Sequence, residues 1–310
     1  MPPGQPPIPV PARDDGGDVL APAEVRPGVN GTALFSASPR VRLAFGLLER
    51  VAPVLGAWWA CRLWMTLPRP RARKAPAEPG APFALDVAGG RVTGRTWGEG
   101  PPVYLVHGWA GHGDQFEHFV APLVGRGFRV VAHDAPSHGR SAPGRHGPRS
   151  SSIPEFAETL TAVAAVHGVP HAVVAHSLGA AAAAAAVAGG LAPGRLVLLA
   201  PMAGPRAHAQ DLAVMLGFGE RTLRRLIRVA ERRVGAPTND YDVPALGRAG
   251  AMPPTLLVHD RGDRSTSPDH ARAIAAAWPG SELRLTEGLG HTRLLRDADV
   301  VARVVDFVVG

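Results

Sequence analysis

Residues 173–180 read Val-Val-Ala-His-Ser-Leu-Gly-Ala. An apolar, β-branched run precedes Ser177 and an alanine-rich run follows it, which predicts a buried strand that turns directly into a tightly packed helix. A strand-to-helix turn sharp enough to expose the serine hydroxyl beyond the sheet requires a strained serine backbone and small residues two positions before and after the serine. Ala175 and Gly179 are those residues, with alanine where the G-x-S-x-G pattern has its first glycine. Taken alone, the pattern also fits an ordinary strand-to-helix turn with a capping serine.

Outward from this stretch, apolar runs alternate with helical patterns. Continuous apolar strands joined by helices are typical of an α/β fold, a mostly parallel twisted sheet covered by helices on both faces. Residues 83–87 and 91–97 add an antiparallel pair at one edge of this sheet. The other predicted elements are strands over 103–106, 128–132, 172–175, 196–200, 255–258 and 282–286, and helices over 115–123, 153–166, 178–188, 269–277 and 297–309.

The domain organisation follows from changes in composition along the chain. Residues 1–37 are rich in proline and glycine and predict a disordered leader. Residues 38–75 predict an amphipathic helical extension and a linker, and residues 76–310 predict the α/β domain. Because the 50 or so residues after position 200 contain helical patterns but no strand, we expect a short helical lid insertion at about 203–252, over the strand ends.

The extension allows two interpretations. Its apolar residues are interrupted by charges such as Arg42 and Glu49, and its longest uncharged stretch, 51–61, is too short for a transmembrane span of about 20 residues. Two amphipathic helices docked on the domain are the simpler interpretation. Peripheral membrane association through residues 41–74, using tryptophans and flanking basic residues, is the alternative.

The composition limits the partners and the location. The net charge is +7, but a single lysine, Lys74, and arginines spread along the chain indicate a compositional bias rather than a nucleic-acid site. The one cysteine, Cys61, leaves no intramolecular disulfide, and the proline-rich start lacks the pattern of a secretory signal, so we expect a cytoplasmic protein. The sequence does not determine the oligomeric state.

Polar residues directly follow the predicted strands, at the edge where a parallel sheet places its ligands. At neutral pH, Ser177 needs a base to take its proton and an acid to orient that base. Asp263 and His291 follow the last two strands in the order that such a triad requires. Asp260 is the near rival of Asp263, but it lies so close to its strand that we expect it to serve the backbone of its own turn.

Acyl chemistry also needs two hydrogen-bond donors aimed at the developing oxyanion. The backbone N–H of Leu178 is the first candidate, because it follows the serine at the N-terminus of the alanine-rich helix. The second donor is expected from the loop after 103–106, where Trp109 is best placed and His107 braces the loop.

Five motifs in this order resemble the α/β-hydrolase superfamily: His107-Gly108-Trp109, Asp134-x-Pro136-x-His138-Gly139-x-Ser141, His176-Ser177-Leu178-Gly179, Asp260-x-x-Asp263 and Gly290-His291. The resemblance covers roughly residues 83–310. It implies a serine hydrolase that cleaves a small-molecule carboxylic ester through an acyl-serine intermediate, without a metal or organic cofactor. Ala175 and Ser137 stand where the family commonly has glycine, but neither is a reacting group. Thioesterase, acyltransferase, perhydrolase and C–C hydrolase activities fit the same triad, and a non-catalytic binding protein of this fold is the alternative from another class.

The remaining motifs have plainer interpretations. The histidines within 107–118 lack the H-E-x-x-H spacing of a helical zinc site, so no metal is predicted. Asp134 is expected to accept N–H bonds within its own turn, and His176 either to pack and hydrogen-bond or to line the substrate entrance. The arginine-rich segment 221–233 is either a solvated face over a buried apolar stripe or a lid that favours anionic substrates or membranes.

Overall fold

The computed structural model describes residues 37–69, 79–87, 90–250 and 252–310. Except for Ala37, the predicted leader lies outside the described residues, and so does most of the predicted linker. The centre of the fold is an eight-stranded sheet in the order β1-β2-β4-β3-β5-β6-β7-β8. Its strands are β1 Ala81–Val87, β2 Gly90–Trp97, β3 Pro102–Val106, β4 Arg129–Asp134, β5 Ala172–His176, β6 Arg195–Leu199, β7 Thr255–Asp260 and β8 Glu282–Thr286.

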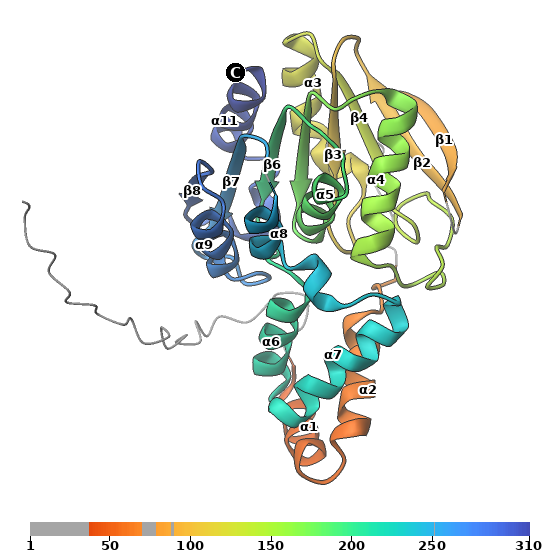
Figure 1. Ribbon diagram of the computed structural model, residues 1–310, viewed down its shortest axis with the longest axis vertical. Coiled ribbons are helices and arrows are strands. Elements are labelled where there is room, and N and C mark those ends of the chain that lie inside the picture. The colour runs from red at the N-terminus through yellow and green to blue at the C-terminus, as the bar shows by residue number, and fades with distance from the viewer. Residues whose placement is uncertain (1–36, 70–78, 88–89, 251) are drawn as a thin grey trace, which may run out of the picture.

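The pairings of β1 with β2 and of β2 with β4 are antiparallel, whereas the other pairings within the described sheet are parallel (Figure 1). This confirms the predicted α/β fold with an antiparallel pair at one edge. The helices are α1 Pro39–Val51, α2 Pro53–Trp64, the 3-10 helix η1 Gly113–Phe116, α3 Glu117–Gly125, α4 Ile153–His167, α5 Leu178–Ala188, α6 Pro205–Leu216, α7 Glu220–Val234, the 3-10 helix η2 Thr238–Tyr241, α8 Val243–Ala249, α9 Pro268–Ala277, α10 Gly290–Arg293 and α11 Ala298–Val309.

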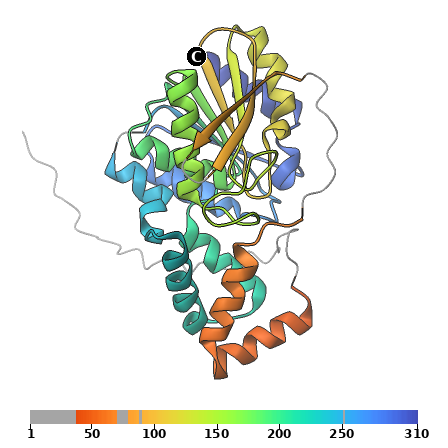
Figure 2. The same cartoon turned by 90° about the vertical axis from the view of Figure 1, so that its right-hand side faces the viewer.

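Side chains of the parallel strands alternate between two apolar cores. In β5, Val173 and Ala175 point into the core that contains α4, α5 and α9, whereas Ala172 and Val174 point into the core that contains α3 and α11. Figures 1 and 2 show these helices as layers on opposite faces of the sheet. Burial on both faces explains why the strand sequences are continuously apolar rather than alternating.

Most element boundaries differ from the sequence-based prediction by one or two residues. β4 continues to Asp134, two residues beyond its predicted end, because Thr93 and Gly94 of β2 extend the antiparallel pairing along it. His291, predicted in a loop, lies in the short helix α10.

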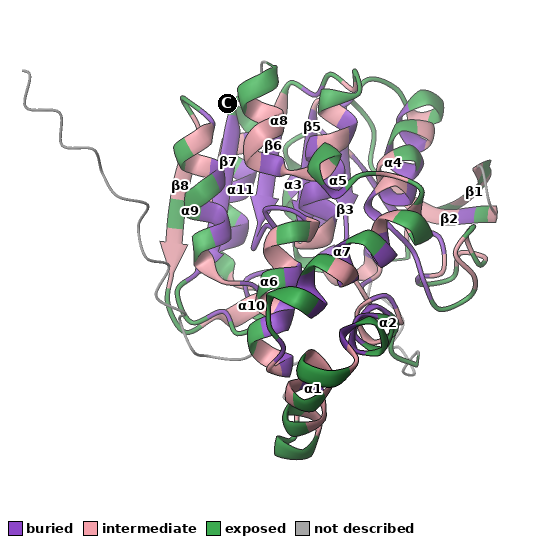
Figure 3. Ribbon diagram, turned by 60° about the horizontal axis from the view of Figure 1, so that its bottom comes forward, coloured by how far each residue is buried: buried purple, intermediate pink, exposed green. Residues whose placement is uncertain are grey.

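The extension and the first part of the insertion together form one helical cap, made of α1, α2, α6 and α7, at one end of the molecule (Figures 1 and 3), whereas α8 of the insertion packs against α5 and α9 beside the sheet. Buried apolar side chains from all four helices share a third core, separate from the two that flank the sheet. Within it the ring of Phe45 stacks on Trp59, with 4.4 Å between ring centroids, and lies 5.5 Å from Phe218. The predicted helices of both segments are thus present, and the extension packs on the insertion rather than on the sheet.

Two sets of polar contacts hold the extension in place. The Glu49 carboxylate of α1 accepts hydrogen bonds from the backbone N–H groups of Arg221 and Thr222, at 3.1 and 3.0 Å, and so caps the N-terminus of α7. Burial raises the pKa of Glu49, but the bonds from Thr222 and Arg221 outweigh it and lower the pKa overall. Beyond α2, Leu67 exchanges hydrogen bonds with Arg149, through its N–H at 2.8 Å and its carbonyl at 3.0 Å.

Gly179 allows α5 to pack closely on β3, and this generates a stability prediction. A Cβ at this position would lie 2.3 Å from the carbonyl oxygen of His107 and 2.7 Å from that of Val106. Because both are backbone atoms, we expect Gly179→Ala to lower the free energy of unfolding by about 1–3 kcal/mol. Gly125→Ala is the matched control, since a Cβ there meets nothing within 4 Å, and it should be neutral or stabilising by up to about 1 kcal/mol. Urea unfolding measures both, and equal stabilities would contradict the close approach.

Candidate active site

Ser177 stands at the corner between β5 and α5 in a backbone conformation that non-glycine residues rarely adopt. Its φ is 55° and its ψ is −119°. The corner is held from both sides, because the Ser177 N–H donates to the Leu199 carbonyl at 2.9 Å and the Ser177 carbonyl accepts from Ala180 at 3.0 Å. The loop after β3 closes on it, since a Cβ on Gly108 would lie 2.8 Å from the Ser177 Cβ. The strained turn that presents a serine hydroxyl at the sheet edge is therefore present.

Three residues from separate strand ends are joined by hydrogen bonds. The Ser177 hydroxyl lies 3.1 Å from Nε2 of His291, and Nδ1 of the same ring lies 2.7 Å from a carboxylate oxygen of Asp263. An Nδ1–H that donates to the carboxylate leaves Nε2 free to accept the serine proton. The structure thus brings the three sequence-predicted side chains together, and it is Asp263, not Asp260, that contacts the imidazole.

The Asp263 carboxylate is fully buried but well supplied with donors. The backbone N–H groups of Ser265 and Thr266 donate to one oxygen at 2.7 and 3.1 Å, and the other oxygen, which contacts His291, also lies 3.2 Å from Nε2 of His259. Burial raises the pKa of Asp263, but the hydrogen bonds from His259 and His291 outweigh it and hold the pKa well below its usual range. The carboxylate is therefore charged at neutral pH. Sequence reasoning missed His259; its position four residues before Asp263, on the same strand end, was the available signal.

Asp260 does more than the predicted task within its own turn. One carboxylate oxygen accepts from the N–H of Gly262 at 2.9 Å, as expected. The other accepts from the Thr286 hydroxyl and the Leu289 N–H, both at 2.9 Å. Asp260 therefore ties the end of β7 to the segment that carries His291.

Two buried histidines brace the segments around Ser177. Nε2 of His176 lies 2.9 Å from the carbonyl oxygen of His291 and donates to it; burial, followed by the nearby His291 ring, lowers the pKa of His176 to about 3. His107 accepts from the Ala135 N–H at Nε2, at 2.9 Å, and donates from Nδ1 to the Gly108 carbonyl, at 2.7 Å. Burial lowers the pKa of His107 as well, so both rings stay neutral and hold these segments in place through their hydrogen bonds.

Asp134 accepts backbone hydrogen bonds, although not only within its own turn. It accepts from Arg140 in that turn, at 2.7 Å, and from Gly113 at the start of η1, at 2.8 Å. Within the described ranges, no group of three or more His, Cys, Asp or Glu side chains has the arrangement of a metal site.

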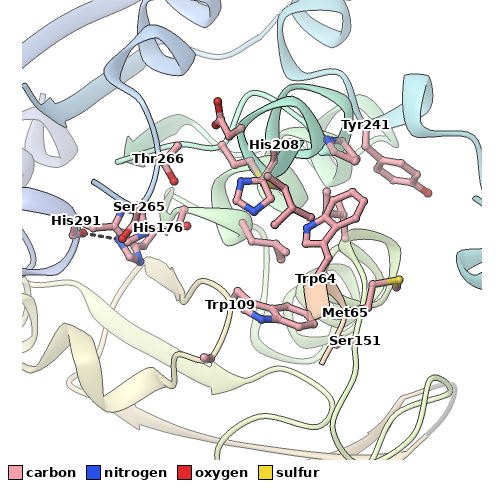
Figure 4. A pocket seen from close by; sticks show the side chains of 18 of the residues that line it. Trp64, Met65, Trp109, Ser151, His176, His208, Tyr241, Ser265, Thr266 and His291 are labelled. Atoms are coloured by element: carbon pink, nitrogen blue, oxygen red, sulfur yellow. Dashed lines mark hydrogen bonds between the residues drawn. The ribbon is translucent and has the colours of Figure 1, made fainter. Parts of the chain in front are cut away.

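A cavity of about 1050 Å³ opens beside Ser177 and extends into the cap (Figure 4). Trp109 and Leu178, the two expected oxyanion donors, line it together with His291. Its opposite wall includes three residues from the C-terminal end of α2 and the turn after it: Leu63, Trp64 and Met65. Nothing in the local sequence indicated that the extension reaches this cavity, because that contact depends on how distant helices pack.

A sheet of this order, with a serine at the β5–α5 corner in reach of a histidine–carboxylate pair, is the arrangement of an α/β hydrolase fold. The sequence model of the alpha/beta hydrolase family matches residues 103–304, so the chain belongs to that family.

Known relatives match shorter parts of the chain. The non-heme haloperoxidase of Rhodococcus erythropolis is 37% identical over 98 residues, which are 32% of this chain and 35% of that protein. A serine hydrolase-like protein of Homo sapiens is 30% identical over 112 residues, which are 33% of this chain and 52% of that protein. The chain therefore matches these relatives over roughly a third to a half of their length.

Solved structures match most of the chain. An esterase from Rhodococcus sp. is similar with a TM-score of 0.55 and 21% identity, covering 73% of this chain and 97% of that one. The thioesterase domain from the curacin biosynthetic pathway gives a TM-score of 0.54 and 19% identity, over 74% and 98%. At these identities the similarity shows the fold alone.

The depressed pKa of Asp263 generates a prediction for stability against pH. Because the folded-state pKa lies below the unfolded value of about 3.9, the charged carboxylate stabilises the fold above that pH, and this contribution is lost as the pH falls. We expect the loss of unfolding free energy in Asp263→Asn to be largest at pH 5–7 and to shrink between about pH 4 and pH 2. Asp306→Asn, at an exposed position of α11, is the control and should follow the wild type throughout. A pH-independent difference for Asp263→Asn would contradict the prediction; denaturant unfolding at each pH measures it.

Proposed function

We propose that the protein is a serine hydrolase that cleaves a carboxylic ester through an acyl-serine intermediate. The observation that carries the proposal is the continuous hydrogen-bonded chain from the Ser177 hydroxyl through His291 to Asp263, which opens on the cavity. A structural serine at a tight turn would have no need of an imidazole 3.1 Å away or of a buried carboxylate behind it. That arrangement supports an enzyme over a non-catalytic binding protein of this fold.

In the proposed first step the Ser177 oxygen attacks the ester carbonyl carbon while Nε2 of His291 takes the hydroxyl proton. The Asp263 carboxylate holds the ring through Nδ1–H and stabilises the imidazolium that forms. The imidazolium then passes its proton to the leaving alkoxide, which departs as an alcohol, and the acyl group stays on Ser177.

The tetrahedral oxyanion is assigned to the backbone N–H groups of Leu178 and Trp109. Leu178 is the first residue of α5, so its N–H has no partner within the helix, and the positive end of the helix dipole adds to it. Trp109 follows Gly108, whose backbone lies directly against Ser177. In the second step water attacks the acyl carbon while Nε2 of His291 takes a proton from it. The bond between the acyl carbon and the Ser177 oxygen then breaks, His291 returns the proton to that oxygen, and the carboxylic acid is released.

The non-heme haloperoxidase relative favours one second candidate, perhydrolysis. Hydrogen peroxide that attacks the acyl-serine in place of water would yield a peracid, and a peracid can oxidise a halide ion. Adding peroxide and bromide to the ester assay separates the two outcomes, because bromide oxidation that requires both the ester and Ser177 would favour this candidate.

Substitution of Ser177 and His291 tests the proposed role of each. A fluorophosphonate probe should label the wild type covalently and leave Ser177→Ala unlabelled. His291→Ala should lower kcat/KM for p-nitrophenyl esters by at least about 10³-fold, because the members of a triad act as a unit. His118→Ala, at a half-exposed position of α3, is the control and should keep wild-type activity. Labelling that persists in Ser177→Ala, or a loss below tenfold in His291→Ala, would refute the proposal.

A further inference from the structure

The cavity beside Ser177 is much larger than a small ester needs. At about 1050 Å³ it slightly exceeds the range of about 300–1,000 Å³ for small-molecule sites. The part that extends into the cap is lined by apolar side chains of three helices and the turn after α2: Leu63, Trp64 and Met65; Leu212, Met215 and Leu216 of α6; and Ala230 and Val234 of α7.

The polar side chains in this part of the wall are few, and they are neutral or bonded to other protein groups. Burial lowers the pKa of His208 to about 4, so its ring is neutral at pH 7. Asp211 is paired with His270 at 3.0 Å, and the Glu231 carboxylate accepts hydrogen bonds from the Thr238 N–H and hydroxyl. A substrate group that enters the cap therefore meets mainly apolar surface.

We propose that the cap binds a long, unbranched acyl chain, so that the preferred substrates are long-chain acyl esters. This rests on the proposed function, and it makes Trp64 and Met215 determinants of specificity. The carbonyl lies at Ser177 and the chain extends toward α2 and α6. Each methylene that enters the apolar part should raise kcat/KM by up to about fourfold, until the cavity is filled.

A series of p-nitrophenyl esters from acetate to palmitate tests the proposal, with Met215→Trp as the variant that narrows the cavity. The wild type should prefer chains well beyond butyrate, and Met215→Trp should lose at least about tenfold in kcat/KM for long chains while acetate hydrolysis changes little. Val214→Trp is the matched control, because Val214 is the adjacent residue on the same helix and is 56% exposed; it should keep the wild-type profile. Leu63→Phe is a milder second variant in case Met215→Trp fails to fold, as judged by probe labelling.

The outcomes separate this proposal from the proposed function. Ser177-dependent acetate hydrolysis without a preference for longer chains would overturn the acyl-chain site alone. Equal profiles for Met215→Trp and Val214→Trp would do the same. Absence of all Ser177-dependent hydrolysis would overturn the proposed function instead.

An independent observation concerns the outer face of the cap. Of the eleven exposed large apolar side chains in the described part of the chain, seven lie on α1 and α2: Leu43, Leu47, Val51, Val54, Leu55, Trp58 and Trp59. None of the helices that the structure describes has the length and apolar character that a membrane span requires.

The helix beside this face is strongly basic. α7 packs against α2 and carries five exposed arginines: Arg221, Arg224, Arg228, Arg232 and Arg233. Glu49, the only acidic residue of α1, is engaged in capping α7, and Glu220 of α7 pairs with one of these arginines, Arg224, at 3.3 Å. Apolar residues with two tryptophans beside a cationic helix are complementary to the surface of an anionic bilayer, which offers acyl chains below negatively charged headgroups.

We infer that the face formed by α1, α2 and α7 docks on an anionic lipid surface. Vesicle sedimentation should show binding to phosphatidylcholine vesicles that contain phosphatidylglycerol and weaker binding to pure phosphatidylcholine. The double substitution Leu55→Ser and Trp58→Ser should lower the vesicle affinity at least tenfold. Val166→Ser with Val169→Ser is the matched control, because these valines are 66% and 77% exposed and lie outside the cap.

Three results would overturn the lipid interpretation. They are absence of binding to anionic vesicles, equal binding of the two double variants, and a wild-type dimer in sedimentation velocity that Leu55→Ser with Trp58→Ser converts to monomer. The last result would assign the face to a second copy of the chain.

Discussion

The left-handed backbone of Ser177 is the constraint on which the rest of the site depends. This conformation costs about 1–3 kcal/mol and persists only where neighbouring structure determines it. Here β6 fixes the serine N–H, α5 fixes its carbonyl, and Gly108 and Gly179 let the β3 loop and the helix approach without a clash. Only because the corner is this tight does the hydroxyl stand at the carboxyl edge of the sheet, where the segments after β7 and β8 also end.

Asp260 and Asp263, three positions apart, have different electrostatic roles at that edge. Asp260 accepts one hydrogen bond from Gly262 in its own turn and two more from Thr286, at the end of β8, and Leu289, so it sets where the segment that carries His291 lies. Asp263 accepts from two N–H groups and contacts two imidazoles, so its charge survives burial and sets how the His291 ring is turned. A buried carboxylate with fewer donors would take up a proton instead, and the ring would lose its orientation.

The sequence was sufficient to predict the features that local sequence patterns determine. Apolar runs predicted the sheet and its edge pair, and the rule that functional residues follow parallel strands selected Ser177, Asp263 and His291, which the structure brings within hydrogen-bonding distance; their catalytic roles remain a proposal. The sequence did not predict features that depend on packing between segments far apart along the chain. The bond from Arg221 to Glu49 spans 172 residues and leaves no local signal, so the joining of extension and insertion into one cap was not foreseen. The same reason hid the cavity wall formed by the end of α2.

Because the cap has a core of its own, the shape of the cavity can change in related proteins while the sheet stays the same. The hydrogen-bonded chain at Ser177 is built from strand ends, whereas much of the cavity wall belongs to helices that pack mainly on one another. Changes in α2 or α6 can therefore reshape the cavity without disturbing the two cores that flank the sheet. Because α2 ends in the cavity wall and exposes Leu55 and Trp58 along its length, one helix links the outer surface to the space beside the serine. A substitution on the buried face of α2 should therefore change both the cavity and the outer surface, since the shared core sets the position of the whole helix.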